Sequence, residues 1–205
     1  MNFILTGATS GIGYATMQQL IENGHTVFAI GRDFSRINTI NHGNKGQIKT
    51  HFFDFEKIND IEKLFLELEL NNEKLDGLVH CAGVEETIPL TLYTPEKIKR
   101  IYDINVLSGI ELLRHFTKKK YSKDGASVVF LSSVMGTLGQ PGKIGYCSTK
   151  SAVLGIVKSA ALEFAKRKIR INAILPGIVN TPLTQNLFDQ IGEENKQIII
   201  DKHPL

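Results

Sequence analysis

The chain alternates short apolar runs with longer amphipathic stretches, and this alternation predicts its fold. The apolar runs are rich in Val, Ile, Leu and Phe, which is typical of parallel strands covered on both faces. We place strands at 2–6, 25–31, 47–53, 76–81, 126–132 and 169–175. We place helices at 12–23, 33–40, 56–70, 95–118 and 145–167. The pattern therefore predicts the α/β class, with a doubly wound parallel sheet and helices on both faces.

A glycine-rich turn joins the first predicted strand to the first predicted helix. It reads Thr6-Gly7-Ala8-Thr9-Ser10-Gly11-Ile12-Gly13. Glycine allows a tight turn and lets the backbone approach a phosphate without a Cβ in the way. The helix that follows offers free N–H groups and the positive end of its dipole to a pyrophosphate. A plain turn explains three glycines in so short a segment poorly, so we predict a nucleotide phosphate site.

Tyr146 and Lys150 lie four positions apart at the start of the last predicted helix, downstream of Ser133. On a helix this spacing puts two side chains on one face, about 6 Å apart along the axis. A nearby ammonium can lower the pKa of a tyrosine by roughly 1–3 units, which suits proton exchange with a substrate oxygen. Such a pair is usually a solvated helix edge. Beside a nucleotide site, however, it indicates acid–base catalysis.

Together these motifs resemble those of the short-chain dehydrogenase/reductase (SDR) family, and the resemblance extends from Asn2 to about Leu205. The family's glycine turn and its Pro-Gly-x-x-x-Thr segment are matched by Thr6, Gly7, Gly11, Gly13, Pro176, Gly177 and Thr181. Its Asn-Asn-Ala-Gly segment stands here as His80-Cys81-Ala82-Gly83, with both Asn residues replaced. Its catalytic Asn, Ser, Tyr and Lys correspond to Asn105, Ser133, Tyr146 and Lys150. The resemblance implies one Rossmann-like, NAD(P)-binding domain over residues 1–205.

The resemblance also implies a mechanism, which is hydride transfer between nicotinamide C4 and a carbonyl carbon. Tyr146 would pass a proton to the carbonyl oxygen and Ser133 would hold that oxygen, with Ser132 as the competing choice. Lys150 would bind the nicotinamide ribose and lower the pKa of Tyr146. Asn105 would hold a water that links Lys150 to solvent, or would simply mark a helix kink.

The end of the second predicted strand bears on the choice between NADP and NAD. Gly31 stands where NAD-preferring relatives have an acidic residue, and Arg32 follows it, which favours NADP because Arg can hold a 2′-phosphate. A shift of one residue would make Asp33 the ribose ligand, so NAD is the alternative. Asp54 would meet the adenine ring or cap the next helix.

The residues expected to contact the cofactor come from the glycine turn, from strand ends and from the segment beside the nicotinamide. They are Thr6, Gly7, Ser10, Gly11, Ile12, Gly13, Arg32, Asp54, Ala82, Gly83, Tyr146, Lys150, Pro176, Gly177, Ile178 and Thr181.

Composition narrows the classes of partner. A net charge of +3 is too small to indicate nucleic-acid binding. No apolar run approaches the roughly 20 residues of a membrane span, and a strand that begins at residue 2 leaves no room for a signal peptide. Cys81 and Cys147 show no zinc spacing. We therefore expect a cytoplasmic protein with reduced cysteines, no bound metal and a small-molecule substrate.

The segment 180–205 is expected to form a substrate loop and lid. Leu183, Leu187, Phe188 and Ile191 have helical spacing, and three isoleucines follow at 198–200. An apolar lid suits an acyl chain, which together with the resemblance makes 3-oxoacyl thioester reduction our first choice. It suits an ordinary amphipathic helix equally well.

Other functions remain open at this point. A sugar or small secondary alcohol is the alternative substrate within the same chemistry. A catalytically idle, NAD(P)-sensing protein on the same fold is a different class. The complete Asn-Ser-Tyr-Lys set argues against an idle protein, because a sensor does not need it.

Two expectations concern the chain end and assembly. SDR proteins normally continue past residue 205 into a further strand and helix, which often build one of two subunit interfaces. The other interface would use the outer faces of 95–118 and 145–167, where Gly155 and several alanines permit close helix approach. We expect a homodimer through these helices, or a homotetramer if the second interface is present.

Overall fold

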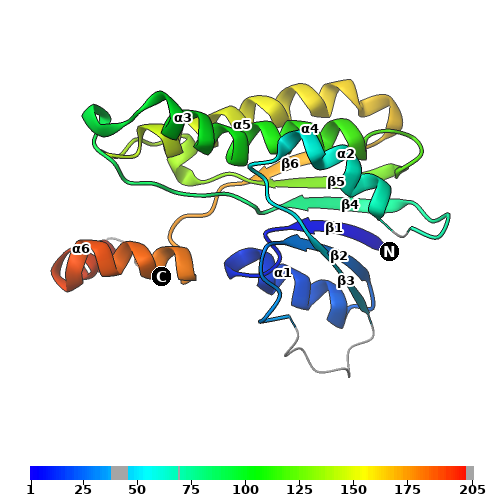
Figure 1. Cartoon of the computed structure of the whole chain (residues 1–205), viewed down its shortest axis with the longest axis horizontal. Coiled ribbons are helices and arrows are strands. Elements are labelled where there is room, and N and C mark those ends of the chain that lie inside the picture. The colour runs from blue at the N-terminus through cyan, green and yellow to red at the C-terminus, as the bar shows by residue number, and fades with distance from the viewer. Residues whose placement is uncertain (38–45, 69, 202–205) are drawn as a thin grey trace.

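The computed structural model describes residues 1–37, 46–68 and 70–201, apart from the side chains at 187, 190 and 191. Its centre is a parallel sheet with the strand order β3-β2-β1-β4-β5-β6 (Figure 1). The strands are β1 Asn2–Thr6, β2 Thr26–Gly31, β3 Gln47–Phe52, β4 Leu75–His80, β5 Ser122–Leu131 and β6 Arg170–Ile174. The order reverses between β1 and β4, and ligands of such sheets bind beyond the strand ends at this switch point. The predicted doubly wound α/β fold is confirmed.

The strand register explains why the two faces of the sheet have different cores. One row of paired residues crosses five strands and is buried throughout: Phe28, Ile4, Leu78, Val128 and Ile171. Successive side chains on a strand point to opposite faces, so this row faces one layer of helices and its neighbours face the other. The neighbours Leu5, Val27 and Ala29 belong to a separate, smaller core.

Helices cover both faces of the sheet (Figure 1). The larger core lies under α2 Ile61–Glu67, α4 Ser108–Phe116 and α5 Ile144–Glu163, and the smaller core lies under α1 Gly11–Glu22. The helix α3 Pro95–Tyr102 begins as expected, because Thr94 caps it by accepting a hydrogen bond from Lys97 N and Pro95 occupies its first turn. The last helix, α6 Pro182–Asp201, extends away from the sheet.

Several predicted boundaries need correction. The helix expected at 95–118 is divided by a π-helical segment, η3 Asp103–Leu107, which separates α3 from α4. The helix expected at 33–40 does not form over 33–37, where the Asp33 carboxylate accepts Ser35 N in a turn, and 38–40 lies outside the described residues. The helix expected at 56–70 is reduced to the short turn η1 Ile58–Asp60 and α2. No helix within the described ranges is long and apolar enough to cross a membrane.

Candidate active site

Two adjoining cavities open beyond the carboxyl ends of the strands. The first, of about 380 Å³, is lined by the glycine turn and by the segments after β2, β3 and β4. The second, of about 290 Å³, is lined by the segments after β4, β5 and β6 and by the start of α5. The cavities share the lining residues Ile12, Cys81, Gly83, Val84, Leu131, Thr181 and Leu183. They therefore form one continuous cleft that runs across the switch point of the sheet.

The glycine turn supplies a cradle that side chains would fill. Gly7 has a φ of +64°, and a Cβ added there would lie 2.8 Å from the Ala82 nitrogen. A Cβ added at Gly13 would overlap the Gly7 carbonyl oxygen. The turn leads directly into α1, whose first N–H groups have no partner within the helix. This backbone fits a pyrophosphate, as the sequence predicts.

Thr6 is the one member of the expected cofactor set that lies away from both cavities. It is fully buried, and its hydroxyl bonds to His80 Nδ1 at 2.8 Å and accepts Ala82 N at 3.1 Å. The Thr6 hydroxyl therefore joins the ends of β1 and β4, and a contact of Thr6 with the cofactor stays a prediction. His80, which replaces a family Asn, is neutral at this position, because burial above all lowers its pKa to about 3.

The cofactor end of the cleft contains Arg32 and Asp54. The Asp33 carboxylate, by contrast, accepts the backbone N–H of Ser35 at 2.9 Å, and the hydrogen bonds from Ser35 hold its pKa below the usual range. The alternative in which Asp33 is the ribose ligand therefore loses support. Asp54 accepts Glu56 N at 3.1 Å in a turn that precedes η1, so it does not cap a helix.

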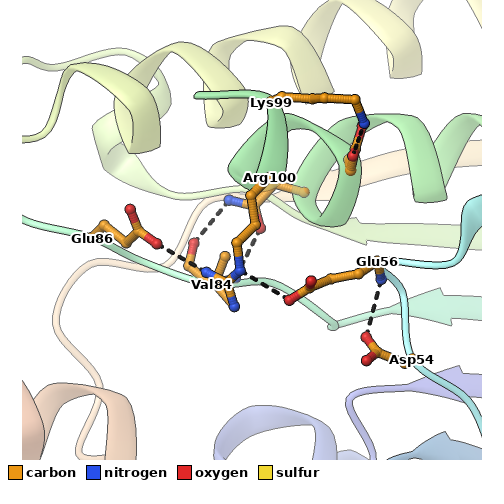
Figure 2. A network of polar contacts seen from close by, with 8 residues as sticks. Asp54, Glu56, Val84, Glu86, Lys99 and Arg100 are labelled. Atoms are coloured by element: carbon orange, nitrogen blue, oxygen red, sulfur yellow. Dashed lines mark hydrogen bonds and ion pairs between the residues drawn. The ribbon is translucent and has the colours of Figure 1, made fainter. Parts of the chain in front are cut away.

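Arg100 fastens two loops that border the cleft (Figure 2). Its guanidinium donates to Glu56 after β3 and to Glu86 after β4, at 2.9 Å in each case. The loop after β4 is also held by Asn105, whose side-chain amide donates to Val84 O at 2.9 Å and accepts Val84 N at 2.8 Å. Both contacts fix the loop from the α3–η3 side.

Asn105 therefore has a structural role, holding the loop after β4, which the sequence only partly indicates. It lies within the π-helical segment, is buried, and also donates to Thr149 on α5 at 3.1 Å. It lines neither cavity, although a Cβ added at Gly83 would lie 3.3 Å from its Oδ1 and 3.5 Å from Lys150 Nζ. The π-helical segment agrees with the alternative of a local helix irregularity, the side-chain amide is engaged by protein groups, and a catalytic role of Asn105 stays a prediction.

Ser133, Tyr146 and Lys150 all line the second cavity. Ser133 follows β5 and accepts Met135 N at 3.2 Å, and its hydroxyl acts to lower the pKa of Tyr146. The competing Ser132 donates instead to the Lys150 carbonyl at 2.8 Å, which commits its hydroxyl to the α5 backbone. The geometry thus favours Ser133 over Ser132.

The electrostatics of Tyr146 differ from the expectation. Burial raises the pKa of Tyr146, the Ser133 hydroxyl opposes this rise, and the charges of Glu85 and Cys147 add to it. Lys150 Nζ lies 5.6 Å from the Tyr146 ring centre and donates to the Leu131 carbonyl at 2.8 Å. The expected lowering of the Tyr146 pKa is therefore wrong here, because burial is the largest influence on this pKa and Lys150 is not among the groups that shift it. Burial also lowers the pKa of Lys150 to about 8.

The remaining wall of the second cavity comes from the segment after β6 and from α6. Pro176, Gly177, Ile178 and Thr181 line this wall together with Leu183 and Ile199 from the lid, and their contact with the nicotinamide stays a prediction. Gly192, with a φ of +78°, breaks α6 between these two lid residues. The ring of Phe188 instead lies near Lys196, whose Nζ is 6.0 Å from the ring centre. The side chains of 187 and 191 are outside the part of the chain that the structure describes.

Several lining residues carry no motif that sequence reasoning detects. Glu85, Met135, Gln140 and Lys143 line the second cavity, and Phe53 and Asn186 line the first. They follow strands or lie in loops, where no periodic pattern points to a function. Position after a strand end is the only signal that was available for Phe53 and Glu85.

Comparison with known proteins agrees with this geometry. Residues 2–192 match the short chain dehydrogenase family. The chain is 28% identical over 201 residues to the 3-oxoacyl-[acyl-carrier-protein] reductase FabG of Rickettsia bellii (strain RML369-C), which covers 98% of this chain and 80% of that protein.

Two solved structures resemble the fold. The 4-hydroxyisoleucine dehydrogenase complexed with NADH and succinate has a TM-score of 0.82 at 30% identity, covering 92% of this chain and 81% of its own. ElxO with NADP bound has a TM-score of 0.79 at 29% identity, covering 92% of this chain and 78% of its own. With a cleft that holds a glycine cradle at one end and Ser133, Tyr146 and Lys150 at the other, the chain belongs to the short-chain dehydrogenase/reductase family of NAD(P)-dependent oxidoreductases.

Proposed function

We propose that the protein interconverts a carbonyl compound and the corresponding secondary alcohol, with Tyr146 as the proton donor in the reducing direction. The observation that carries this proposal is the continuity of the cleft from the glycine cradle to Tyr146. When bound there, the cofactor supplies or accepts the hydride. A proton source beside the cofactor pocket completes what carbonyl reduction requires.

Each residue of the second cavity has a separate role in this proposal. The Tyr146 hydroxyl donates its proton to the carbonyl oxygen, and its raised pKa keeps it protonated at neutral pH. Ser133 donates a hydrogen bond to the same oxygen and fixes its position. Lys150 would hold the nicotinamide ribose, and its lowered pKa makes it able to return a proton to Tyr146. Asn105 keeps the loop after β4 in place through its two hydrogen bonds to Val84. In the proposal, a water molecule near Asn105 links Lys150 to solvent.

NADP is the cofactor that we propose. Arg32 lines the cofactor end of the cleft while the Asp33 carboxylate is engaged by Ser35. An Arg–phosphate contact is charge-assisted and often bidentate, so Arg32 suits the 2′-phosphate. Ile12, Ala82 and Gly83 complete the wall against which the dinucleotide would lie.

A 3-oxoacyl thioester is the substrate class that we propose first. The 3-oxoacyl-[acyl-carrier-protein] reductase named above supports it, and so do apolar residues in the wall around Tyr146, namely Val134, Met135, Ile178, Val179, Leu183 and Ile199. The charges of Glu85 and Lys143 in this wall cancel in an ion pair, which suits an uncharged carbonyl compound.

A small secondary alcohol, including a sugar, is the second candidate. The cavity around Tyr146 has a volume of only about 290 Å³, at the lower limit of small-molecule pockets. The structural neighbour that acts on 4-hydroxyisoleucine, with succinate bound, shows a related fold with a compact polar compound.

One assay separates these substrates. NADPH oxidation is followed with 3-oxoacyl thioesters of increasing chain length and with a panel of small ketones and sugars. The proposal predicts the highest kcat/KM for a thioester. A higher value for a small polar ketone would transfer the assignment to the second candidate, and no oxidation with any carbonyl compound would contradict carbonyl reduction.

We also propose a homodimer formed by the outer faces of the α3–η3–α4 segment and of α5. Leu107 and Ile110 are exposed, and a Cβ added at Gly155 would meet no atom within 4 Å, so this part of α5 is not packed on its own subunit. Ala160, by contrast, is buried in the core of its own subunit. Light scattering tests the proposal, and a monomer would contradict it.

A cytoplasmic location is our remaining proposal about the protein's setting. Cys81 and Cys147 are both unbonded thiols, which suits a reducing compartment. Fractionation of cells that express the protein would test this, and recovery in a secreted fraction would contradict it.

A further inference from the structure

The cavity around Tyr146 contains a charged pair that the proposed reaction does not use. Glu85 lies in the loop after β4 and Lys143 immediately precedes α5, and their side chains form an ion pair inside the cavity wall. Lys143 is only 4% exposed. Removing one partner of such a pair leaves the other as an uncompensated buried charge, which is strongly unfavourable. The position of each side chain therefore depends on the other.

The pair connects two segments that both line the substrate cavity, the loop after β4 and the loop before α5. Lys143 is the residue before the first turn of α5, and its carbonyl accepts Cys147 N at 2.8 Å. A backbone hydrogen bond from Ile88 N to Gly142 O, at 2.7 Å, joins the same two loops nearby. The side-chain and backbone contacts together hold the loop after β4 against the start of the helix that carries Tyr146.

Tyr146 is surrounded by opposing charges. Two ammonium groups flank its ring, with Lys143 Nζ at 6.0 Å and Lys150 Nζ at 5.6 Å from the ring centre. Glu85 acts on it from the loop after β4 and raises its pKa, as does Cys147 on α5, whereas Ser133 after β5 lowers it. The Glu85 carboxylate raises the pKa of Tyr146, whereas an unpaired ammonium at Lys143 would favour the phenolate, so the two charges of the pair act on the phenolic proton in opposite directions.

We propose that the Glu85–Lys143 pair is a positioning element of the active site. It fastens the loop after β4 to the start of α5, and it places the Glu85 carboxylate and the Lys143 ammonium together beside Tyr146. This inference rests on the proposed function, because it assumes that Tyr146 is the proton donor. Neither side chain transfers a proton or the hydride in the proposed reaction, so the pair affects the chemical step by positioning Tyr146.

The test is the pKa of Tyr146, measured by carbon-13 NMR of the full chain with labelled tyrosine, with Tyr146→Phe to assign the signal. Glu85→Gln leaves the Lys143 cation unpaired and should lower this pKa, whereas Lys143→Met leaves the Glu85 carboxylate unpaired and should raise it. Each shift should be about one unit. The double variant should return the pKa to its original value, and Lys63→Met, which breaks an exposed pair on α2, should leave it unchanged.

The second arm tests the link between the loops. The charge-exchanged variant Glu85→Lys with Lys143→Glu can form the pair again, so its kcat should exceed that of either single variant. If the single variants do not fold, the charge-exchanged variant is compared with the double variant Glu85→Gln with Lys143→Met, which lacks the pair, and its kcat should be the higher of the two. Equal or same-direction pKa shifts, or an exchanged variant no better than the single ones, would overturn the proposal. Because the NMR titration needs no turnover, its outcome is separate from any failure of carbonyl reduction.

Discussion

Replacing Lys150 with methionine should abolish turnover and at the same time stabilise the fold. Lys150 is buried and its pKa falls from 10.5 to about 8, which means that the folded protein disfavours the charged lysine. Each pKa unit corresponds to about 1.4 kcal/mol, so the charge opposes folding by roughly 3 kcal/mol at neutral pH. Methionine has a similar length and carries no charge, and it suits irregular buried sites.

The gain is reduced by one lost hydrogen bond. Lys150 Nζ donates to the Leu131 carbonyl at 2.8 Å, and leaving this acceptor without a partner costs roughly 1–2 kcal/mol. The net stabilisation should therefore be about 1–2 kcal/mol. For a chain of this size, that corresponds to a Tm increase of roughly 2–8 °C.

The pH dependence provides the sharper part of this prediction. Because the folded pKa lies below the unfolded value, the cost is present below pH about 8 and disappears as the pH rises towards 10.5. Urea unfolding of both proteins at pH 7 and pH 10 measures it, with Lys158→Met on the exposed side of α5 as the control. A less stable Lys150→Met at pH 7, or a difference that does not shrink by pH 10, would refute the reasoning.

Three further predictions concern the cofactor end of the cleft and the core beneath it. Arg32→Ala should weaken NADPH binding at least tenfold and leave NADH binding nearly unchanged. Asp33→Ala should alter the binding of neither cofactor, and fluorescence titration measures all of these affinities. Gly13→Ala should abolish binding of both cofactors in the same titration, because its Cβ would overlap the Gly7 carbonyl, and unimpaired binding would contradict the cradle. Buried His80 has a pKa of about 3 against 6.5 unfolded, so it should make the protein lose about 1.4 kcal/mol of stability per pH unit as the pH falls from 6.5. His80→Asn should remove this part of the acid sensitivity, and identical acid unfolding of both proteins would argue against it.

The strands were the most predictable part of the fold. The runs containing Ile4, Phe28 and Leu78 are apolar because both faces of the sheet are covered, so their hydrophobicity alone marks them. The boundaries at Asp33 and within 95–118 were missed for physical reasons. Asp33 forms a turn through its own side chain, and the π-helical segment depends on contacts of Asn105 with residues far away in the sequence.

In the candidate site, too, local features were predictable from the sequence and features that depend on tertiary contacts were not. The glycine turn and the Tyr146–Lys150 spacing are local features, so the sequence is enough to predict their place in the cleft. The choice between Ser132 and Ser133 depends on a hydrogen bond to α5, which only the folded chain reveals. Thr6 was assigned to the cofactor because of its motif, although its hydroxyl serves the junction of β1 and β4. The raised pKa of Tyr146 depends on burial, which spacing does not indicate.

The measurement that tests the account most directly is a comparison of kcat and NADPH affinity between wild type and Tyr146→Phe, using the best substrate from the carbonyl panel. The substitution removes only the phenolic hydroxyl from the cavity and leaves the ring that packs there. Loss of a positioned acid should lower kcat by roughly 10²–10⁴-fold, with the dissociation constant of NADPH nearly unchanged. A kcat close to that of the wild type would contradict the assignment of Tyr146 as the proton donor, and with it the proposed mechanism.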